Sequence, residues 1–316
     1  MKLMFTSVGR RVELIQLFKA AAKKNNIDLT IFGADMSESA PAMLFCDRQV
    51  IVPRIRSEQY IATLLDICTK EKIDALIPTI DTDLLILAQN RDQFAAIGTC
   101  VIVSAPDRIA LCRDKRFTAN YFRSIGLESP VSVDRVQDYR GGFPAFIKPK
   151  DGSSSVFAYK VDTQEELISY AKQVPNYIVQ PFIKGTEYTV DIFCDFDGNP
   201  IYITPRIRLA VRAGEVLKTE IAQDRKIICE IMKLIEDYRP CGPITVQLIR
   251  QDDTGLDYYI EINPRFGGGA PLSMMAGADA ATALLKLLKG EKQSYVTNAA
   301  EDGAIYSRFD QSIRVK

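Results

Sequence analysis

Three side chains with oxygen donors lie near the end of the chain at a spacing that could place them around a metal ion. Glu261 and Asn263 are two residues apart in a β-rich run, and Gln247 lies in the apolar run 243–249 that precedes it. The turn-forming residues 252–255 between the two runs predict a β-hairpin. Two neighbouring antiparallel strands would therefore carry all three donors.

The phase of the second strand decides whether these donors converge. Residues two apart in a strand face the same side, so Glu261 and Asn263 are expected to share a face with Tyr259, and Ile260 and Ile262 to lie opposite. One carboxylate and two amides suit a hard cation such as Mg²⁺, with Mn²⁺ as an alternative, and do not suit zinc. A solvent-facing strand has the same alternation, so a polar sheet face remains an open interpretation.

A lysine before a loop of small residues is a candidate phosphate site. Lys148 ends an apolar run, and the loop that follows contains Gly152, Ser153, Ser154 and Ser155. Backbone N–H groups of such a loop can approach phosphate oxygens closely, and the lysine adds a positive charge beside them. The pattern predicts a phosphate-binding lid, although the Walker motif Gly-x-x-x-x-Gly-Lys-Ser/Thr is absent. A surface loop beside a solvated lysine is the alternative.

A run that ends in proline is a candidate site for a nucleoside. Val179 and Gln180 lead into Pro181 and Phe182, and Glu187 follows shortly afterwards. Backbone groups at the end of such a strand can hydrogen-bond the edge of an adenine, and a carboxylate can accept hydrogen bonds from ribose hydroxyls. The alternative for Glu187 is a polar residue that only begins the next strand.

A basic cluster occupies residues 206–218. Arg206, Arg208 and Arg212 share the parity of one strand face, which predicts a cationic row that binds a γ-phosphate or a substrate carboxylate. We expect Arg212 and Lys218 from this cluster to act in catalysis. An edge strand protected by charge would show the same pattern. The later glycines 267–269 either shape an acceptor pocket or form a turn.

Composition restricts the class of protein. The 316 residues are 47% apolar and 25% charged, as in a globular protein of two or three domains. The 40 basic and 40 acidic residues balance, so neither nucleic acid nor a membrane is expected as a partner. Seven cysteines without a Cys-x-x-Cys pair, and no signal-peptide pattern, predict a cytoplasmic protein. The absence of histidine excludes Ser-His, Cys-His and His-metal chemistry.

Alternating strand and helix patterns predict the first domain. Strands are expected at 3–8, 29–34, 49–52, 75–80 and 100–104, and helices at 11–24, 57–72 and 82–96. This order predicts an α/β domain with a doubly wound parallel sheet over residues 1–105, with a ligand crevice beyond the carboxyl ends of its strands. Residues 7–11, Asp35 and 81–83 are expected there. Helix capping is favoured over substrate contact for 81–83, and the lone Gly9 argues against a dinucleotide-binding loop.

The rest of the chain is expected to form two α+β lobes. A small lobe over residues 106–183 would contain a helix at 106–125, strands at 156–160 and 177–180, and a helix capped by Thr163 and Glu166. A C-terminal lobe over residues 184–316 would contain β-hairpins, helices near 224–238 and 278–289, and a short strand at 304–307.

The order of these motifs resembles that of the ATP-grasp superfamily, and in particular the large-subunit type of carbamoyl-phosphate synthase. The residues that carry the resemblance are Lys115, Ile147-Lys148-Pro149 with its Gly/Ser loop, Gln180-Pro181-Phe182-Ile183, Gly185-Thr186-Glu187, Gln247 and Glu261-Ile262-Asn263-Pro264-Arg265. The N-terminal region is similar to the pre-ATP-grasp domain of that family. The chain departs from the pattern at Gln180, where many relatives have glutamate, and it holds a single module.

The resemblance implies a nucleotide held between two lobes, with the following roles. Lys115 and Lys148 would meet the phosphates, residues 179–182 the adenine, Glu187 the ribose, Gln247, Glu261 and Asn263 the magnesium ions, and Arg265 the transferring phosphoryl group. The implied activity is ATP-dependent ligation of a small-molecule carboxylate to an amine, or to a thiol, through an acyl phosphate, with release of ADP. A homodimer is left open. The alternative function is a nucleotide-binding module that serves a partner protein without turnover.

Overall fold

The N-terminal region forms a five-stranded parallel sheet in the order β3-β2-β1-β4-β5. The computed structural model describes residues 1–152 and 156–315, so the lid serines Ser153, Ser154 and Ser155 lie outside the described residues. The strands are β1 (Lys2–Thr6), β2 (Thr30–Asp35), β3 (Arg48–Ile51), β4 (Ala75–Pro78) and β5 (Cys100–Val101). The doubly wound parallel sheet predicted from the sequence is confirmed.

Helices cover both faces of this sheet. They are α1 (Val12–Lys24), the 3₁₀ turn η1 (Pro41–Phe45), α2 (Gln59–Glu71), α3 (Asp81–Gln89) and α4 (Arg91–Ala96). Side chains of α1 pack with Leu3 and Phe5 on one face, whereas those of α2 and α3 pack with Met4 and Leu76 on the other. The single helix expected at 82–96 is divided at Asn90, whose backbone φ of −109° is not helical.

The connection to the second region contains a break that the sequence pattern did not reveal. The single helix expected at 106–125 is instead α5 (Pro106–Arg113) and α6 (Lys115–Ser124). Asp114 between them is extended, with φ −116° and ψ 118°, and its carboxylate accepts a hydrogen bond from the N–H of Arg116. Such a cap satisfies a backbone donor at the start of a helix. Lys115 therefore occupies the first turn of a new helix rather than the middle of a long one.

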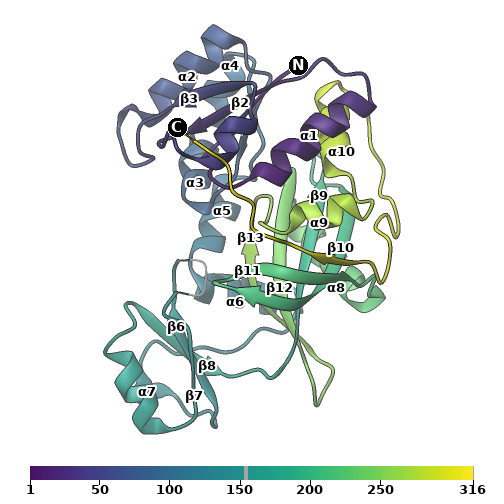
Figure 1. Cartoon of the computed structure of the whole chain (residues 1–316). Helices are drawn as coiled ribbons and strands as arrows, with labels where there is room; N and C mark the ends of the chain where they lie inside the picture. The colour runs from purple at the N-terminus through teal and green to yellow at the C-terminus, as the bar shows by residue number, and fades with distance from the viewer. Residues whose placement is uncertain (153–155, 316) are drawn as a thin grey trace.

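A small lobe contains the strands β7-β6-β8 and one helix. Its elements are the 3₁₀ turn η2 (Val136–Asp138), β6 (Ala145–Pro149), β7 (Tyr159–Val161), α7 (Gln164–Ala171) and β8 (Tyr177–Pro181). Thr163 caps α7 by accepting from the N–H of Glu166, and Glu166 accepts from the N–H of Asp162. This lobe has its own apolar core and lies at one end of the molecule, away from the N-terminal sheet (Figure 1).

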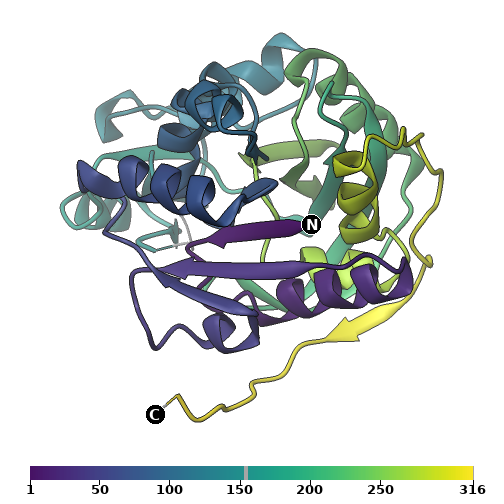
Figure 2. The same ribbon diagram turned by 90° about the horizontal axis from the view of Figure 1, so that it is seen from above.

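The C-terminal lobe is built on a six-stranded antiparallel sheet in the order β13-β12-β9-β10-β11-β14. Its strands are β9 (Gly185–Cys194), β10 (Pro200–Arg212), β11 (Glu215–Ile221), β12 (Pro243–Gln251), β13 (Asp257–Asn263) and β14 (Ile305–Ser307). Its helices are α8 (Arg225–Tyr238), α9 (Ala270–Met275) and α10 (Ala280–Leu288). Helix α9 was not expected from the sequence. Beyond β14 the chain runs as an extended tail on the outside of the molecule (Figure 2).

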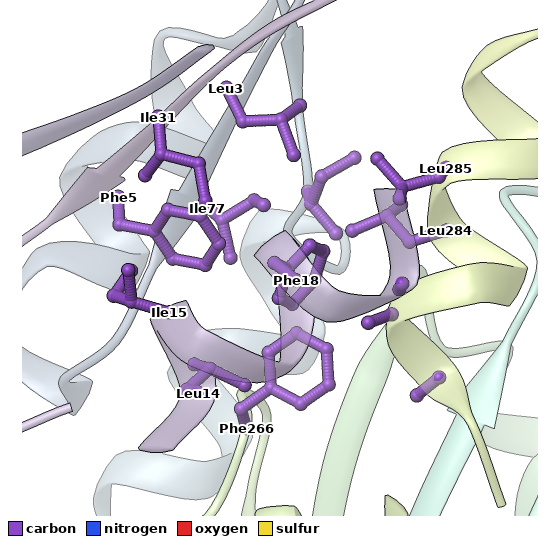
Figure 3. Packing of buried hydrophobic residues seen from close by; sticks show 14 of the residues in the cluster. Leu3, Phe5, Leu14, Ile15, Phe18, Ile31, Ile77, Phe266, Leu284 and Leu285 are labelled. Atoms are coloured by element: carbon purple, nitrogen blue, oxygen red, sulfur yellow. The ribbon is translucent and has the colours of Figure 1, made fainter. Parts of the chain in front are cut away.

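One apolar core joins the N-terminal sheet to the C-terminal lobe. Figure 3 shows Phe18 of α1 between Phe5 of the sheet and Phe266, which follows β13. Its ring makes edge-to-face contacts with both, at centroid distances of 5.0 and 6.0 Å. Leu284 and Leu285 of α10 belong to the same cluster. Because α1 is buried on both sides, the loop before it is held at a fixed position relative to the end of β13.

A carboxylate is buried beneath the loop that follows β1. Asp83 is fully buried, and its Oδ2 accepts hydrogen bonds from the hydroxyls of Thr6 (2.8 Å), Ser7 (2.9 Å) and Tyr60 (3.2 Å). Burial raises the pKa of Asp83. Neither Asp81 nor Asp83 caps α3 with a side-chain hydrogen bond, so the expected capping role is wrong.

We predict that Asp83→Ala lowers the free energy of unfolding by about 1–3 kcal/mol, because three hydroxyls lose their buried acceptor. Urea denaturation followed by circular dichroism measures the change. Asp66→Ala, at an exposed position on α2, serves as the control and is expected to change stability by at most about 0.5 kcal/mol. Equal effects of the two substitutions would show that the buried hydroxyl cluster contributes little.

Candidate functional site

A cavity of about 860 Å³ lies where all three parts of the chain meet. Its walls include Arg11 and Asp81 from the N-terminal region, Lys148 from the small lobe and Glu261 from the C-terminal lobe. Among the described residues, seven basic and five acidic side chains line it. The excess of positive charge and the size of the cavity suit an anionic ligand as large as a nucleoside triphosphate.

The β12–β13 hairpin brings the three expected metal ligands to one face of the sheet. Gln247 lies directly opposite Glu261 in the strand register, and Asn263 lies opposite Thr245. All three ligands line the cavity, whereas Ile262 belongs to the core on the other face. The sequence prediction that these donors share a face is therefore confirmed by their positions.

The sequence analysis placed Tyr259 on the same strand face as Glu261 and Asn263, and this prediction is wrong. The register shifts between Gln247 and Leu248, so that Leu248 pairs with Tyr259 and Ile260 is the extra residue of a bulge. A bulge reverses the inward and outward alternation. Tyr259 is consequently buried with Ile262 in the core, and Ile260 lines the cavity beside Glu261.

Arg265 connects the end of β13 to the N-terminal region. Its Nη2 donates to Asp81 Oδ2 at 2.6 Å and lies 3.4 Å from Asn263 Oδ1. Asn263 in turn donates from Nδ2 to Glu261 Oε1 at 2.9 Å. The Nε of Arg265 is buried without a hydrogen-bond partner among the described residues. The expected catalytic arginine therefore lies in the cavity with an unused donor.

Two lysines enter the cavity from the small-lobe side. Lys148 is 7% exposed, and burial lowers its pKa to about 8, with the charge of Lys115 as a further cause. Burial also lowers the pKa of Lys115, whose Nζ donates to the carbonyl of Gly152 at 2.9 Å. A buried ammonium group and a half-buried one that repel one another are stabilised when an anion binds between them. The expected phosphate-binding lysines are thus placed together.

The expected nucleoside residues are only partly brought to the cavity. Gln180, Phe182 and Glu187 line it, and Glu187 Oε2 lies 3.4 Å from Nε of Arg208. Val179 does not line the cavity, and its N–H and carbonyl are both hydrogen-bonded to Val133. The adenine contact expected at Val179 is therefore wrong, because no backbone group remains free there.

The structure brings Arg206 and Arg208 of the expected basic row to the cavity, but it does not bring Arg212 of the same row or the further candidate Lys218 to it. The first two line the cavity, whereas Arg212 is exposed at the end of the hairpin and pairs with Asp310 at 2.8 Å. Lys218 of β11 is also exposed and does not line the cavity. Neither residue is positioned to act in catalysis.

Arg206 is the most buried charge at the site. Its side chain is 2% exposed, and its Nε donates to Asp191 Oδ2 at 2.7 Å. Asp191 also accepts from the hydroxyl of Ser273 at 2.6 Å. The Nη1 of Arg206 has no hydrogen-bond partner among the described residues. A fully buried ion pair with an unused donor beside a cavity points to a ligand that accepts a hydrogen bond there.

Some residues of the site were not assigned from the sequence. Arg11 and Thr82 line the cavity from the N-terminal sheet. The glycines 267–269, for which the sequence left a pocket and a turn open, line it after Arg265. A Cβ at Gly269 would lie 2.5 Å from Nη2 of Arg206, so this position requires glycine for close approach. The sequence did place residues 7–11 and 81–83 in a crevice, but nothing in it showed that this crevice opens into the site of Glu261.

Gln247, Glu261 and Asn263 suit a magnesium ion that is also coordinated by the phosphate oxygens of a ligand. Glu261 is the single carboxylate among the three expected ligands, and no cluster of three or more His, Cys, Asp or Glu residues suited to a metal occurs in the described chain. Mg²⁺ is commonly held by one or two carboxylates, waters and substrate phosphates. The amide orientation of Asn263, which now points Nδ2 at Glu261, must reverse for its oxygen to bind a metal.

Two known families match separate parts of the chain. Residues 3–102 match the family described as "PylC-like, N-terminal domain", and residues 173–309 match the family described as "ATP-grasp in the biosynthetic pathway with Ter operon". The chain belongs to the ATP-grasp superfamily. The likeness to carbamoyl-phosphate synthase is also confirmed, since the large chain of that enzyme from Xylella fastidiosa is 26% identical over 79% of this ATP-grasp chain and 26% of its own length.

Two further proteins resemble this ATP-grasp chain. The 3-methyl-D-ornithine–L-lysine ligase of Methanosarcina acetivorans is 26% identical over 57% of the chain and 46% of the ligase. The biotin carboxylase domain of Hydrogenobacter thermophilus 2-oxoglutarate carboxylase, solved with MgADP and bicarbonate, has a TM-score of 0.76 at 15% identity, over 96% of this chain and 73% of that one. The ATP-grasp fold is thereby confirmed. The match spans about half the length of the first curated relatives.

In the described part of this ATP-grasp protein, no helix is both long enough and apolar enough to cross a membrane.

We predict that Mg²⁺ binds to this ATP-grasp protein only together with a nucleotide. The single carboxylate at the expected site leaves most of the coordination sphere to be filled by phosphate oxygens and water. Isothermal titration calorimetry with MgCl₂ is expected to show no saturable binding to the protein alone and clear binding when ADP is present. Strong binding without a nucleotide would indicate a different metal site.

Proposed function

We propose that the protein is an ATP- and Mg²⁺-dependent ligase that joins a carboxylate to an amine and releases ADP and phosphate. The observation that carries the proposal is the convergence on one cavity of Lys115, the buried Lys148, the Glu261 hairpin and Arg265. Phosphoryl transfer requires positioning and charge neutralisation more than covalent catalysis, so this set is sufficient without histidine.

The small lobe and the C-terminal sheet would bind ATP between them. Lys115 and Lys148 neutralise the phosphates, and Glu187 accepts hydrogen bonds from the ribose. The adenine edge is bound by the backbone just beyond β8. Strand pairing supports this choice. Phe182 donates its N–H to Pro144, so its neighbours Pro181 and Ile183 are expected to direct their backbone groups away from β6.

Glu261, Asn263 and Gln247 would hold the Mg²⁺, which neutralises charge on the phosphates when it is bound. In the first step a substrate carboxylate oxygen attacks the γ-phosphorus, the bond from that phosphorus to the β–γ bridging oxygen breaks, and ADP leaves. Arg265 faces this reaction because it lies beside Asn263 and has an unused Nε. The product of the step is an acyl phosphate.

In the second step an amine replaces the phosphate. The neutral amine nitrogen attacks the acyl carbon, the bond between that carbon and the phosphate oxygen breaks, and inorganic phosphate departs with the electron pair. The amine proton passes to the departing phosphate or to water, and an amide remains. The cationic lining of the cavity, including Arg206 and Arg208, stabilises the anionic intermediate.

Amino acids are the proposed substrate class. The relative from Methanosarcina acetivorans is named as a ligase of 3-methyl-D-ornithine and L-lysine, which are both amino acids. The cavity contains both guanidinium groups and the carboxylates Asp81 and Glu215. These groups suit a substrate that carries a carboxylate and an ammonium group.

The decisive experiment is incubation of the protein with ATP, Mg²⁺ and pairs of amino acids, with separation of the nucleotides by chromatography. ADP and phosphate formed in equal amounts, together with an amide product detected by mass spectrometry, are the expected result. Hydroxylamine added in place of the amine should trap the acyl phosphate as a hydroxamate. Formation of AMP and pyrophosphate would contradict the mechanism. Tight ATP binding without turnover on any pair would favour a non-catalytic nucleotide-binding module.

A further inference from the structure

The N-terminal sheet has a ligand crevice of its own, and this crevice opens into the cavity. β1 and β4 are neighbours at the centre of the sheet, and the helices that follow them, α1 and α3, pack on opposite faces. Where connections diverge in this way, the loops at the carboxyl ends of the two strands leave a crevice between them. Arg11 from the first loop and 80–82 from the second line the cavity.

Arg11 is a nearly buried guanidinium with few partners. Its side chain is 19% exposed, and its one side-chain hydrogen bond to the described residues is a long contact of 3.4 Å from Nη2 to the carbonyl of Thr79. The nearest carboxylate oxygen in the described chain is Glu215 Oε1, at 3.9 Å from Nη1. A guanidinium has five N–H donors, so most of the donors of Arg11 are unused. Burial and the neighbouring charge of Arg265 lower its pKa.

Glu215, whose Oε1 lies 3.9 Å from Nη1 of Arg11, is shared with a second arginine. Nη1 of Arg308 in the C-terminal tail lies 3.2 Å from Glu215 Oε2 and donates to the carbonyl of Val216 at 3.3 Å. Arg308 also pairs with Glu13 of α1 at 3.6 Å. The tail therefore fixes Glu215 at the edge of the cavity and leaves the guanidinium of Arg11 available.

Gly268 packs closely against the ends of the Arg11 and Glu215 side chains. A Cβ added to Gly268 would lie 2.9 Å from Nη1 of Arg11 and 2.2 Å from Oε2 of Glu215, so a larger residue would displace one of these side chains. Glycine at this position therefore lets both side chains approach the backbone at the edge of the cavity.

We propose that Arg11 binds the carboxylate of the amine substrate, so that the ligase accepts an amino acid with a free carboxylate in preference to a simple amine. This inference rests on the proposed function and names the chemistry of the second substrate. The carboxylate that is phosphorylated is assigned to Arg265, which contacts Asn263 of the proposed metal site, and the carboxylate bound by Arg11 is therefore assigned to the other substrate. The amide product therefore retains this carboxylate.

The test compares each standard amino acid with its primary amide, which has the same amine but no carboxylate. ADP release is measured for the wild-type protein, Arg11→Gln, Arg11→Lys and the control Arg10→Gln. Arg10 is the adjacent arginine, but its side chain is 84% exposed and its partner is Asp310 in the tail. The Arg11→Lys variant keeps the charge and loses the paired donors, which separates charge from geometry.

For the wild-type protein and Arg10→Gln, we expect a lower KM for the amino acid than for its amide. Arg11→Gln should raise the KM of the amino acid by roughly ten- to hundredfold, as expected for a lost hydrogen-bonded charge pair, and leave the KM of the amide nearly unchanged. The KM of Arg11→Lys for the amino acid should lie between those of the wild-type protein and Arg11→Gln. Equal use of amino acid and amide by the wild-type protein, or an Arg11→Gln variant that still discriminates, would overturn the inference.

A binding measurement keeps this inference separate from the proposed function. If no pair of substrates releases ADP, the proposed function fails, and thermal unfolding with the same amino acids and amides then decides the role of Arg11. Stabilisation by amino acids but not by amides, in the wild-type protein and Arg10→Gln but not in Arg11→Gln, would support the carboxylate site. Equal shifts in all three proteins would refute it.

Discussion

Replacement of Glu261 by glutamine is expected to lower kcat by about 10²–10³-fold while the protein remains folded. Glu261 is the single carboxylate among the three expected metal ligands, and it faces the cavity directly opposite Gln247. Without its charge, Mg²⁺ loses its strongest protein ligand, and the phosphates lose part of their neutralisation. The loss corresponds to about 2.7–4 kcal/mol of barrier, the range found when one group that stabilises a transition state is removed.

The structure gives a reason for the unchanged stability of this variant. Within the described residues, Glu261 makes no ion pair, and the hydrogen bond it accepts from Asn263 can also be accepted by a glutamine oxygen. Thermal unfolding should therefore match the wild-type protein. Calorimetry with MgADP should show weaker metal-dependent binding. Glu236→Gln, an exposed position on α8, is the control. A Glu261→Gln variant with an unchanged rate would remove Glu261 from the metal site.

The second large effect is expected at Lys148, where stability and binding should change in opposite directions. Lys148→Met should weaken ATP binding by roughly ten- to hundredfold, because a charged hydrogen-bond donor to phosphate is lost. The same substitution should raise the free energy of unfolding of the ligand-free protein by about 1–3 kcal/mol, because a buried ammonium group is replaced by an apolar side chain. Calorimetry and urea denaturation measure the two effects, and Lys172→Met, an exposed site in the small lobe, is the control.

The pH dependence of Lys148 follows from the direction of its pKa shift. The pKa is about 8 in the folded protein and 10.5 for an unperturbed lysine. Between these values the unfolded chain binds more protons, so the stability of the ligand-free protein should rise with pH from about 8 to about 10.5. ATP affinity should fall over the same window, because the lysine loses its charge above pH 8. Lys148→Met should lack both dependences, and a variant that retains them would contradict the assignment.

The sequence alone was sufficient for the features that depend on local pattern. Alternating strands and helices predicted the parallel N-terminal sheet. A helix after each strand carries the chain back along the sheet, so that the next strand runs in the same direction as the one before. Residues two apart on a strand predicted that Glu261 and Asn263 share a face, and the turn residues predicted that Gln247 lies beside them. The order of the lysine, the proline-ended strand and the Glu-x-Asn-Pro-Arg run was enough to recognise the superfamily.

The rule that alternate residues of a strand share a face failed where a strand is irregular. The bulge at Ile260 moved Tyr259 into the core. One extra residue reverses every later side chain in a strand, and no residue type in this run marks where it occurs. The helix break at Asp114 was hidden for a similar reason, because an aspartate inside a helical run is compatible with a continuous helix.

By itself, the sequence determined the fold class, the family and the set of groups available for phosphate and metal, because each depends on residue type and short spacing. Only the tertiary structure decided that Arg11 and Asp81 join the site of Arg265, although more than 180 residues separate Asp81 from Arg265 along the chain. That contact exists because α1 is buried between the N-terminal sheet and the C-terminal helices, a packing of surfaces that no local pattern encodes.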